Sequence, residues 1–167
     1  MKSRVALSPL AASDEKAFLQ AVLRSRDLHH PWVSPPRVAR EFRALVKRMN
    51  GSANVGFGVR LTDAAQLVGF IEVTNIVHGA FRSGYLGYYA FSGNEGRGLT
   101  KEALRQSIQF AFQELQLHRL EANIQPGNVA SIALVRSCSF VKEGYSERYL
   151  RVRGRWRDHE RWAIVAR

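Results

Sequence analysis

The chain has 167 residues, of which 46% are hydrophobic, so it is long enough to bury a full core and too apolar to be disordered by composition. Its 25 Lys and Arg residues against 14 Asp and Glu give a net charge of +11, which attracts anionic partners without selecting among RNA, an acidic protein and a phosphorylated cofactor. A single cysteine, Cys138, excludes an internal disulfide and a cysteine-based metal cluster. No run is long enough for a membrane span, and the first residues lack the apolar stretch of a signal peptide. We therefore expect a cytoplasmic protein without a membrane partner, folded as a single domain over residues 1–167.

The first third of the chain is expected to form a strand, a helix, a loop and a second helix. Residues 4–10 suit a short strand, and Ser13 or Asp14 can cap a helix that runs to about residue 26. A loop with three prolines, 27–36, leads to a second helix that stops near residue 50. The expected core residues are Ala17, Leu19, Val22 and Leu23 in the first helix, and Val38, Phe42, Leu45 and Val46 in the second.

The rest of the chain alternates between β-structure and helices. A strand followed by a helix and a further strand predicts one parallel crossover, whereas the remaining strands suit antiparallel hairpins. The expected class is therefore α/β, with a central, mixed but mostly antiparallel sheet, one parallel crossover and helices on both faces. The expected elements are strands at 55–61, 67–77, 85–91 and 120–124, a helix from about 99 to 115, a short helix from about 128 to 137, and a final hairpin of strands 140–152 and 155–165.

The turn Gly96-Arg97-Gly98 lies between the third of these strands and the long helix. Glycines there permit positive φ and close approach of a ligand, and the free N–H groups of the helix make an anion cradle suited to a pyrophosphate. A purely structural turn has the same pattern, so both interpretations stay open on this stretch alone. The turn fits neither a dinucleotide-binding fingerprint, whose third glycine would fall at Lys101, nor a P-loop, in which a Lys-Ser/Thr pair follows the glycines.

Three segments in this order, 95–99, 124–134 and 140–145, resemble the acetyl-CoA-binding motifs of the GCN5-related N-acetyltransferases. Within that superfamily, Gly84–Tyr88 and Gly154–His159 are similar to motifs of the ribosomal-protein alanine N-acetyltransferases of the RimJ and RimL type, and most similar to RimJ. The resemblance runs from about residue 67 to 162. It implies the GCN5-related N-acetyltransferase fold, acetyl-CoA as co-substrate with no metal, and a protein N-terminus, possibly on the ribosome, as the acceptor.

The resemblance also assigns the cofactor-binding residues. Gly96 and Gly98 match the family's turn, but Gly93 stands where the family has Gln or Arg, so a side chain is lost while the backbone amides that hold the pyrophosphate remain. Asn128 matches the asparagine that binds the pantetheine side, and Ser131 matches the serine near the sulfur. The implied cofactor-binding residues are Phe91, Glu95, Gly96, Arg97, Gly98, Leu99, Thr100, Asn128 and Ser131.

The implied reaction is direct attack of a neutral amine on the thioester, with a polarised carbonyl and a stabilised thiolate. Glu72, the only acid in an apolar strand and on the face expected to hold Val68 and Phe70, is the candidate base through a water, with a raised pKa; a structural ion pair or an edge position is the alternative. Ser131 is the candidate donor to the leaving sulfur, or it bonds a local carbonyl. An α-amino group, with a pKa of about 8, needs only a weak base.

Acceptor contacts are expected from Trp32, Asn75 and Tyr88, although Trp32 also suits the core and Asn75 a strand end. His29 and His30 lack metal-ligand spacing. Two other functions stay open. One is acetylation of a small amine, an antibiotic or a lysine; the other is a non-catalytic module that binds RNA or the ribosome through the basic and aromatic stretch 149–159. The sequence allows a monomer or a homodimer.

Overall fold

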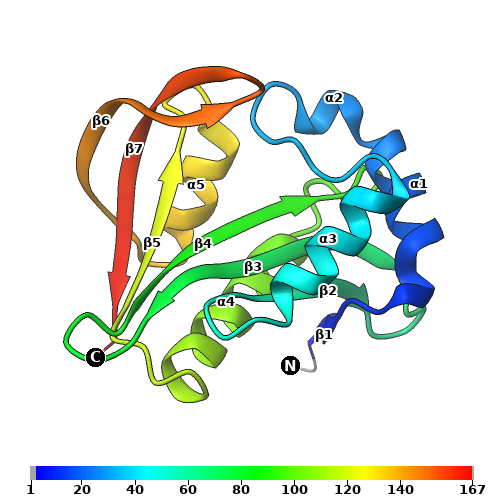
Figure 1. Ribbon diagram of the computed structural model, residues 1–167, viewed down its shortest axis with the longest axis horizontal. Coiled ribbons are helices and arrows are strands. Elements are labelled where there is room, and N and C mark those ends of the chain that lie inside the picture. The colour runs from blue at the N-terminus through cyan, green and yellow to red at the C-terminus, as the bar shows by residue number, and fades with distance from the viewer. Residues whose placement is uncertain (1–2, 167) are drawn as a thin grey trace.

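The computed structural model describes residues 3–166 and contains one seven-stranded sheet flanked by helices (Figure 1). The strand order is β1-β2-β3-β4-β5-β7-β6, and every neighbouring pair is antiparallel except β4–β5. This confirms the predicted α/β class and its single parallel crossover. The strands are β1 (Val5–Pro9), β2 (Val55–Leu61), β3 (Leu67–Val77), β4 (Ser83–Ala90), β5 (Arg119–Ile124), β6 (Val141–Val152) and β7 (Arg155–Val165); the helices are η1 (Ala12–Asp14), α1 (Glu15–Arg24), α2 (Arg26–His29), α3 (Ala39–Met49), α4 (Leu99–Gln113) and α5 (Val129–Ser137).

Helices cover both faces of the sheet, as predicted. Figure 1 shows α3 in front of β2 and β3, with α4 behind them. One hydrophobic cluster joins α4 and α5 to the sheet through Leu104 and Val135, both fully buried. A second cluster joins α1 and α3 to the opposite face through Phe18 and Phe42, whose ring centroids lie 5.1 Å apart. The sheet is therefore the middle layer of three.

The core stripe of α1 differs from the prediction. Phe18, Ala21 and Val22 are buried, whereas Ala17 is exposed and Leu23 is 55% exposed. The buried positions recur at the three- and four-residue spacing of a helix face, but the apolar residues of this helix extend round more than one face, so the pattern allowed two choices. Val38 was also wrongly placed in the core, since it precedes α3 and is 51% exposed.

A β-bulge changes which residues of β3 share a face. Val59 of β2 pairs with Gly69, but the next residue pairs with Leu67, so Val68 is the extra residue. Leu67 and Phe70 consequently pack beneath α1 and α3, while Val68 packs on the α4 side. The expectation that Val68 shares a face with Glu72 was wrong, because strict alternation along β3 breaks at this bulge.

The parallel strands β4 and β5 separate along their length. They pair only from Ser83 to Tyr85 with Arg119 to Glu121. Figure 1 shows them diverging like the two arms of a V, with β7 on the far side of β5. Within the described strands, the facing backbone groups beyond Tyr85 and Glu121 have no ladder partner, so their N–H and C=O groups are free for a ligand or water. The candidate site lies at this opening.

Candidate active site

The opening between β4 and β5 is a cavity of about 120 Å³. Both strands contribute to its walls, and the first turn of α5 closes one end. Because the strand edges that face it carry unpaired backbone groups, the cavity can accept a thin polar chain that hydrogen-bonds like an added strand. Its lining residues are Trp32, Val33, Leu86, Gly87, Tyr88, Ala122, Asn123, Ile124, Gln125, Asn128, Ser131 and His159.

A larger cleft of about 570 Å³ opens on the α3 face of the sheet. Its walls are α3, the loop before α3, β3 and β4, and the tip of the β6–β7 hairpin. Trp32, Val33, Gly87 and Tyr88 line both the cleft and the cavity between the strands. The two spaces therefore meet beside Gly87 and Tyr88, where a ligand in one can reach a ligand in the other.

Glu72 lies in the wall of this cleft, as expected for a base. Burial raises the pKa of its carboxyl group, and the Arg48 guanidinium, 3.2 Å from Glu72 Oε2, partly opposes that shift. The side chain is 22% exposed. Across the β3–β4 ladder, a Cβ at Gly87 would lie 3.2 Å from Glu72 Oε1, so glycine at this position makes room for the carboxylate. The raised pKa predicted from the sequence is confirmed, and the ion pair considered as its alternative is also present.

Ser131 and Tyr88 form a hydroxyl pair. Tyr88 Oη lies 2.6 Å from Ser131 Oγ, which joins β4 to the first turn of α5. Burial raises the pKa of Tyr88 to about 12, so its hydroxyl stays protonated at neutral pH. Tyr88 lines the cleft, so its expected contact with the acceptor stays a prediction, and the structure also couples it to Ser131, the candidate sulfur donor. This pairing could not be predicted from a local pattern, because the two residues are 43 positions apart.

Asn128 is the N-cap of α5. Its Oδ1 accepts a hydrogen bond from the N–H of Ser131 at 3.2 Å, which fixes the first turn of the helix. The side-chain Nδ2 donates to no other described residue, so it remains available to a carbonyl in the cavity that Asn128 lines. Asn128 and Ser131 thus reach the same cavity, as the sequence predicted.

The glycine turn before α4 has the geometry of an anion cradle. Gly93, Gly96 and Gly98 have φ values of +93°, +71° and +76°, and Gly98 is the N-cap of α4. No heavy atom lies within 4 Å of a Cβ built at Gly93 or Gly96. The backbone is thus open to close approach, and the first N–H groups of a fifteen-residue helix point toward the space. These residues fit a pyrophosphate.

Side chains on either side hold this turn in place. Glu95 Oε2 accepts the N–H of Gly93 at 2.7 Å, and backbone N–H groups of the turn lower the pKa of its carboxyl. Arg4, the residue before β1, donates to the carbonyl of Arg97 at 2.9 Å and forms an ion pair with Glu102 in α4. Sequence reasoning missed Arg4, because its partners are more than 90 positions away. The remaining expected cofactor residues lie here as well: Phe91 is buried beneath the turn, and Leu99 and Thr100 begin α4.

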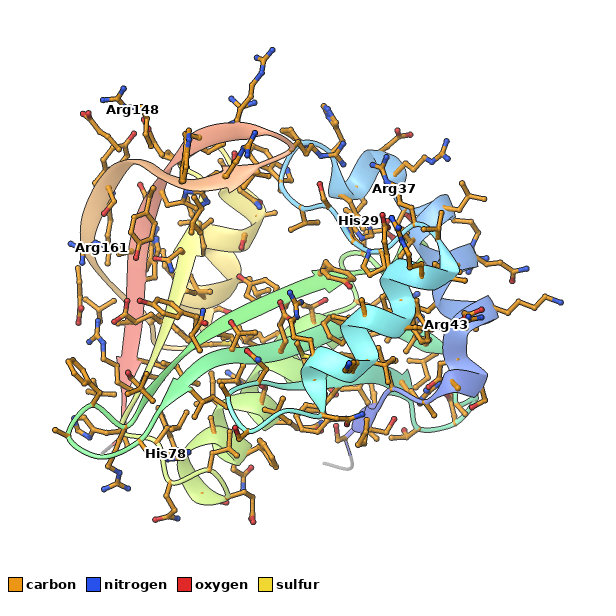
Figure 2. All side chains as sticks on the ribbon, viewed as in Figure 1. His29, Arg37, Arg43, His78, Arg148 and Arg161 are labelled. Carbon is orange, nitrogen blue, oxygen red and sulfur yellow. The ribbon has the colours of Figure 1, made fainter. Side chains whose placement is uncertain are left out.

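Two buried polar residues attach α1 and α2 to the start of this turn. His29 Nε2 donates to the carbonyl of Ala90 at 2.8 Å, and burial lowers the pKa of the imidazole. Ser25 Oγ accepts the N–H of Ser92 at 2.9 Å. Figure 2 shows His29 on the inner side of α2. His29 therefore has a structural role, because it holds the end of β4 next to the glycine turn. It does not line the cleft.

Trp32 and Asn75, two residues expected to contact the acceptor, have different positions. Trp32 is half-buried at the junction of cleft and cavity, with its ring 3.1 Å from where a Gly127 Cβ would lie. Asn75 is exposed at an irregularity of β3, has a φ of +50°, and lines neither space. Asn75 thus lies outside both spaces, and its contact with the acceptor stays a prediction.

Two other features are absent from residues 3–166. No group of three His, Cys, Asp or Glu side chains in this part of the chain is placed to hold a metal ion. None of its helices combines the length and the apolar character that crossing a bilayer requires.

Comparison with known proteins gives a consistent result. Residues 4–141 match the acetyltransferase (GNAT) domain. The chain is 38% identical over 109 residues, 65% of its length, to the [ribosomal protein uS5]-alanine N-acetyltransferase of Escherichia coli, and 25% identical over 170 residues to a spermidine N(1)-acetyltransferase of Vibrio cholerae, covering 99% of the chain and 95% of that protein. The E. coli protein is matched over only 56% of its own length, and a 31% identical probable N-acetyltransferase of Bacillus subtilis over 66%.

A solved structure resembles the whole fold. Mycobacterium smegmatis RimJ in complex with CoA-disulfide superposes with a TM-score of 0.89 at 30% identity, covering 97% of this chain and 82% of that one. The likeness therefore extends over nearly the whole of this chain.

Proposed function

Because the chain belongs to the GNAT acetyltransferase family, we propose that it transfers an acetyl group from acetyl-CoA to the α-amino group of a protein N-terminus. The observation that carries this proposal is the junction of two spaces at Gly87 and Tyr88. One space suits a pantetheine chain, and the other is wide enough for the end of a peptide. Glu72 lies on the acceptor side, and Ser131 lies on the cofactor side.

Acetyl-CoA supplies the thioester whose acetyl group is transferred. In this proposal the backbone N–H groups of Arg97, Gly98, Leu99 and Thr100 bind its pyrophosphate at the glycine turn. The unpaired edges of β4 and β5 and the Asn128 amide bind the pantetheine arm. The backbone beside Tyr88 is then the nearest source of N–H donors for the carbonyl oxygen.

Glu72 acts as the base in this scheme. The attacking amine must lose a proton, and an α-ammonium group with a pKa of about 8 requires only a weak acceptor. The raised pKa of Glu72 brings its basicity closer to that of the amine, and its position in the cleft wall allows a water to carry the proton. Arg48, paired with the carboxylate, keeps enough of it ionised to accept that proton.

Ser131 and Tyr88 stabilise the departing sulfur. If Tyr88 donates to Ser131 Oγ, the serine hydrogen is free to point at the sulfur. A thiol has a pKa of about 8.5, well below the value of about 12 for Tyr88, so the pair stabilises a thiolate by hydrogen bonding and does not give up its proton fully. The two hydroxyl groups thus act as hydrogen-bond donors in series, and both stay protonated through the reaction.

A protein N-terminus is favoured as acceptor by the E. coli relative, which modifies an alanine of ribosomal protein uS5, and by RimJ as a structural neighbour. A small polyamine is the competing acceptor, because the V. cholerae relative acts on spermidine. The deciding experiment is mass spectrometry of N-terminal ribosomal-protein peptides and of spermidine after incubation with acetyl-CoA and the purified protein. A gain of one acetyl group on a peptide amine supports the proposal, and acetylation of spermidine alone would refute it.

Contact with the ribosome is supported by the hairpin of β6 and β7. Trp156 is 61% exposed and pairs across the β6–β7 ladder with Arg151, which is also exposed. A flat aromatic ring beside guanidinium groups suits unpaired RNA bases and phosphates. If this contact exists, binding to ribosomes weakens with salt and with Trp156→Ala, while acetylation of free peptides does not change.

A further inference from the structure

The charges that line the large cleft point to a particular class of acceptor. We infer that the cleft selects protein N-termini with an acidic side chain shortly after the first residue, and that Arg151 and Arg153 are the specificity-determining residues. This inference rests on the proposed function and goes beyond it by naming the acceptor's charge.

Five charged side chains line the cleft, two of them acidic and three basic: Glu41, Glu72, Arg48, Arg151 and Arg153. Both carboxylates already have partners. Glu72 is paired with Arg48, and Glu41 Oε2 accepts the N–H of Arg37 at 2.7 Å, which caps the start of α3. Both acidic groups therefore have a hydrogen-bond partner before any acceptor arrives, and Glu72 is also neutralised by a cation.

Arg151 and Arg153 have no such neutralisation. Arg151 Nε bonds the carbonyl of Gly154 at 3.3 Å, and Arg153 Nη2 bonds the carbonyl of Val33 at 3.1 Å. Within residues 3–166, neither guanidinium has a carboxylate oxygen within 4.0 Å. Each guanidinium carries five N–H donors, so most of its hydrogen-bonding capacity is free.

The position of the two arginines suits a role in acceptor recognition. Both come from the hairpin tip, on the opposite side of the cleft from α3, and both are exposed. We call this exposed side of the cleft, at Arg151 and Arg153, its mouth. The bond from Arg153 to Val33 ties the hairpin to the loop that carries Trp32. A peptide whose amine faces Glu72 leaves the cleft through this mouth, so its second to fourth residues pass the guanidinium groups.

This arrangement favours one charge and opposes the other. A carboxylate at the mouth gains charge-assisted hydrogen bonds from a planar guanidinium, without displacing an existing ion pair. A polyamine instead brings several ammonium groups into a cleft whose lining has three cations and two anions, of which Glu72 is already paired with Arg48. Because both arginines are exposed, the preference should be moderate and should weaken as salt is added.

The test uses three peptides with the same N-terminal alanine that differ at positions two to four, carrying acidic, neutral amide or lysine side chains. For the unaltered protein we expect kcat/KM for acetylation to be about tenfold higher with the acidic than with the lysine peptide at low salt. The variant Arg151→Glu/Arg153→Glu should reverse this order. Spermidine should be a poor substrate for the unaltered protein and a better one for the double variant.

Arg148→Glu is the matched control. Arg148 lies on the same hairpin, shares the positive φ of Arg153 and is exposed, but it does not line the cleft, and Figure 2 shows it directed outward. This variant changes the net charge by two units without touching the mouth, so the peptide preference should persist. Affinity for acetyl-CoA, measured by calorimetry, should be equal in all three proteins, which checks that each one is folded.

The outcomes separate the inference from the proposed function. If all three peptides are acetylated at equal rates, or if Arg148→Glu has the same effect as the double variant, the inference is wrong while the proposed function stands. If no peptide is acetylated although acetyl-CoA binds, the proposed function itself fails.

Discussion

Glu72 is subject to two opposing effects at a single carboxyl group. Burial beside Phe70 and Tyr89 raises its pKa, and Arg48 lowers it, with burial the larger effect. A purely structural ion pair would stabilise the fold through the charged form, whereas a carboxylate held ready as a base is kept ionised at some cost to stability. These two roles predict opposite effects when the charge is removed.

For Glu72→Gln we expect a fall in kcat of about a hundredfold with little change in acetyl-CoA affinity, because a base is lost and the cofactor site is untouched. The folded-state pKa of Glu72 is raised, so the ionised form costs stability above that pKa, and the variant should unfold at an equal or higher temperature at pH 7. Steady-state kinetics and thermal unfolding test both points. Normal turnover, or a lower unfolding temperature, would favour the structural ion pair.

The Tyr88–Ser131 pair acts through one hydrogen bond, so its members should not act independently. Ser131→Ala should lower kcat by about ten- to a hundredfold, and Tyr88→Phe should lower it less, because serine can still donate alone. The double variant should be no worse than Ser131→Ala, since the tyrosine acts through the serine. If the two effects on kcat at saturating acetyl-CoA are fully additive, the two residues act independently and the proposed coupling is wrong.

At the scale of elements, the turn between β4 and α4 depends on glycine for its conformation and on the helix N-terminus for its charge preference. Gly98 has a φ of +76°, which strains the backbone of most other residues. An alanine variant could therefore lose stability as well as cofactor affinity, and the two effects could not be separated. Asn and Asp tolerate this conformation best, and both can cap a helix. They differ chiefly in charge, which makes them a matched pair.

We expect Gly98→Asp to bind acetyl-CoA at least about tenfold more weakly than Gly98→Asn, because only the aspartate repels the pyrophosphate; a tenfold change corresponds to about 1.4 kcal/mol. Isothermal titration with acetyl-CoA measures the difference. Equal affinity of the two variants would show that the pyrophosphate binds elsewhere.

An element could be predicted from the sequence where its apolar pattern was compatible with only one buried face. The strand, turn and helix around Gly98 followed from a buried run, two glycines and an apolar stripe, and all three are present. The stripe of α1 was misassigned, because both Phe18 and Leu23 are apolar and only tertiary contacts decide which is buried. The bulge at Val68 has no local signal, since it is created by its pairing with β2.

At the scale of the whole molecule, the site depends on contacts between distant parts of the chain. His29 attaches α2 to the end of β4, Arg4 ties β1 to the glycine turn, and Tyr88 bonds Ser131. No periodicity or motif links such residues, so the sequence indicated single members of the site without showing which ones touch. The family resemblance placed Asn128 and Ser131 together, but the Tyr88 contact required the three-dimensional arrangement.

Two buried histidines connect the stability of the fold to pH. Burial lowers the pKa of His29 and of His159 below the ordinary value of 6.5. Between the lowered values and 6.5 the unfolded chain binds more protons, so stability is complete above pH 6.5 and is lost as pH falls below it. Denaturant unfolding should show this decline as the pH is lowered below 6.5. His29→Gln, which retains a donor for the Ala90 carbonyl but cannot ionise, should show a shallower decline; an unchanged slope would assign the effect to other groups.

The central claim is that a protein N-terminus meets acetyl-CoA where the cleft joins the opening between β4 and β5. The most direct measurement is the transfer reaction itself, with purified protein, acetyl-CoA and N-terminal peptides of ribosomal proteins, read by mass spectrometry beside Gly98→Asp and Glu72→Gln. We predict one added acetyl group on the peptide α-amine, formed more slowly with Gly98→Asp at cofactor concentrations that just saturate the unaltered protein and strongly slowed with Glu72→Gln. An acetyl group found only on spermidine or lysine side chains, or a peptide left unmodified by a protein that binds acetyl-CoA, would contradict the claim.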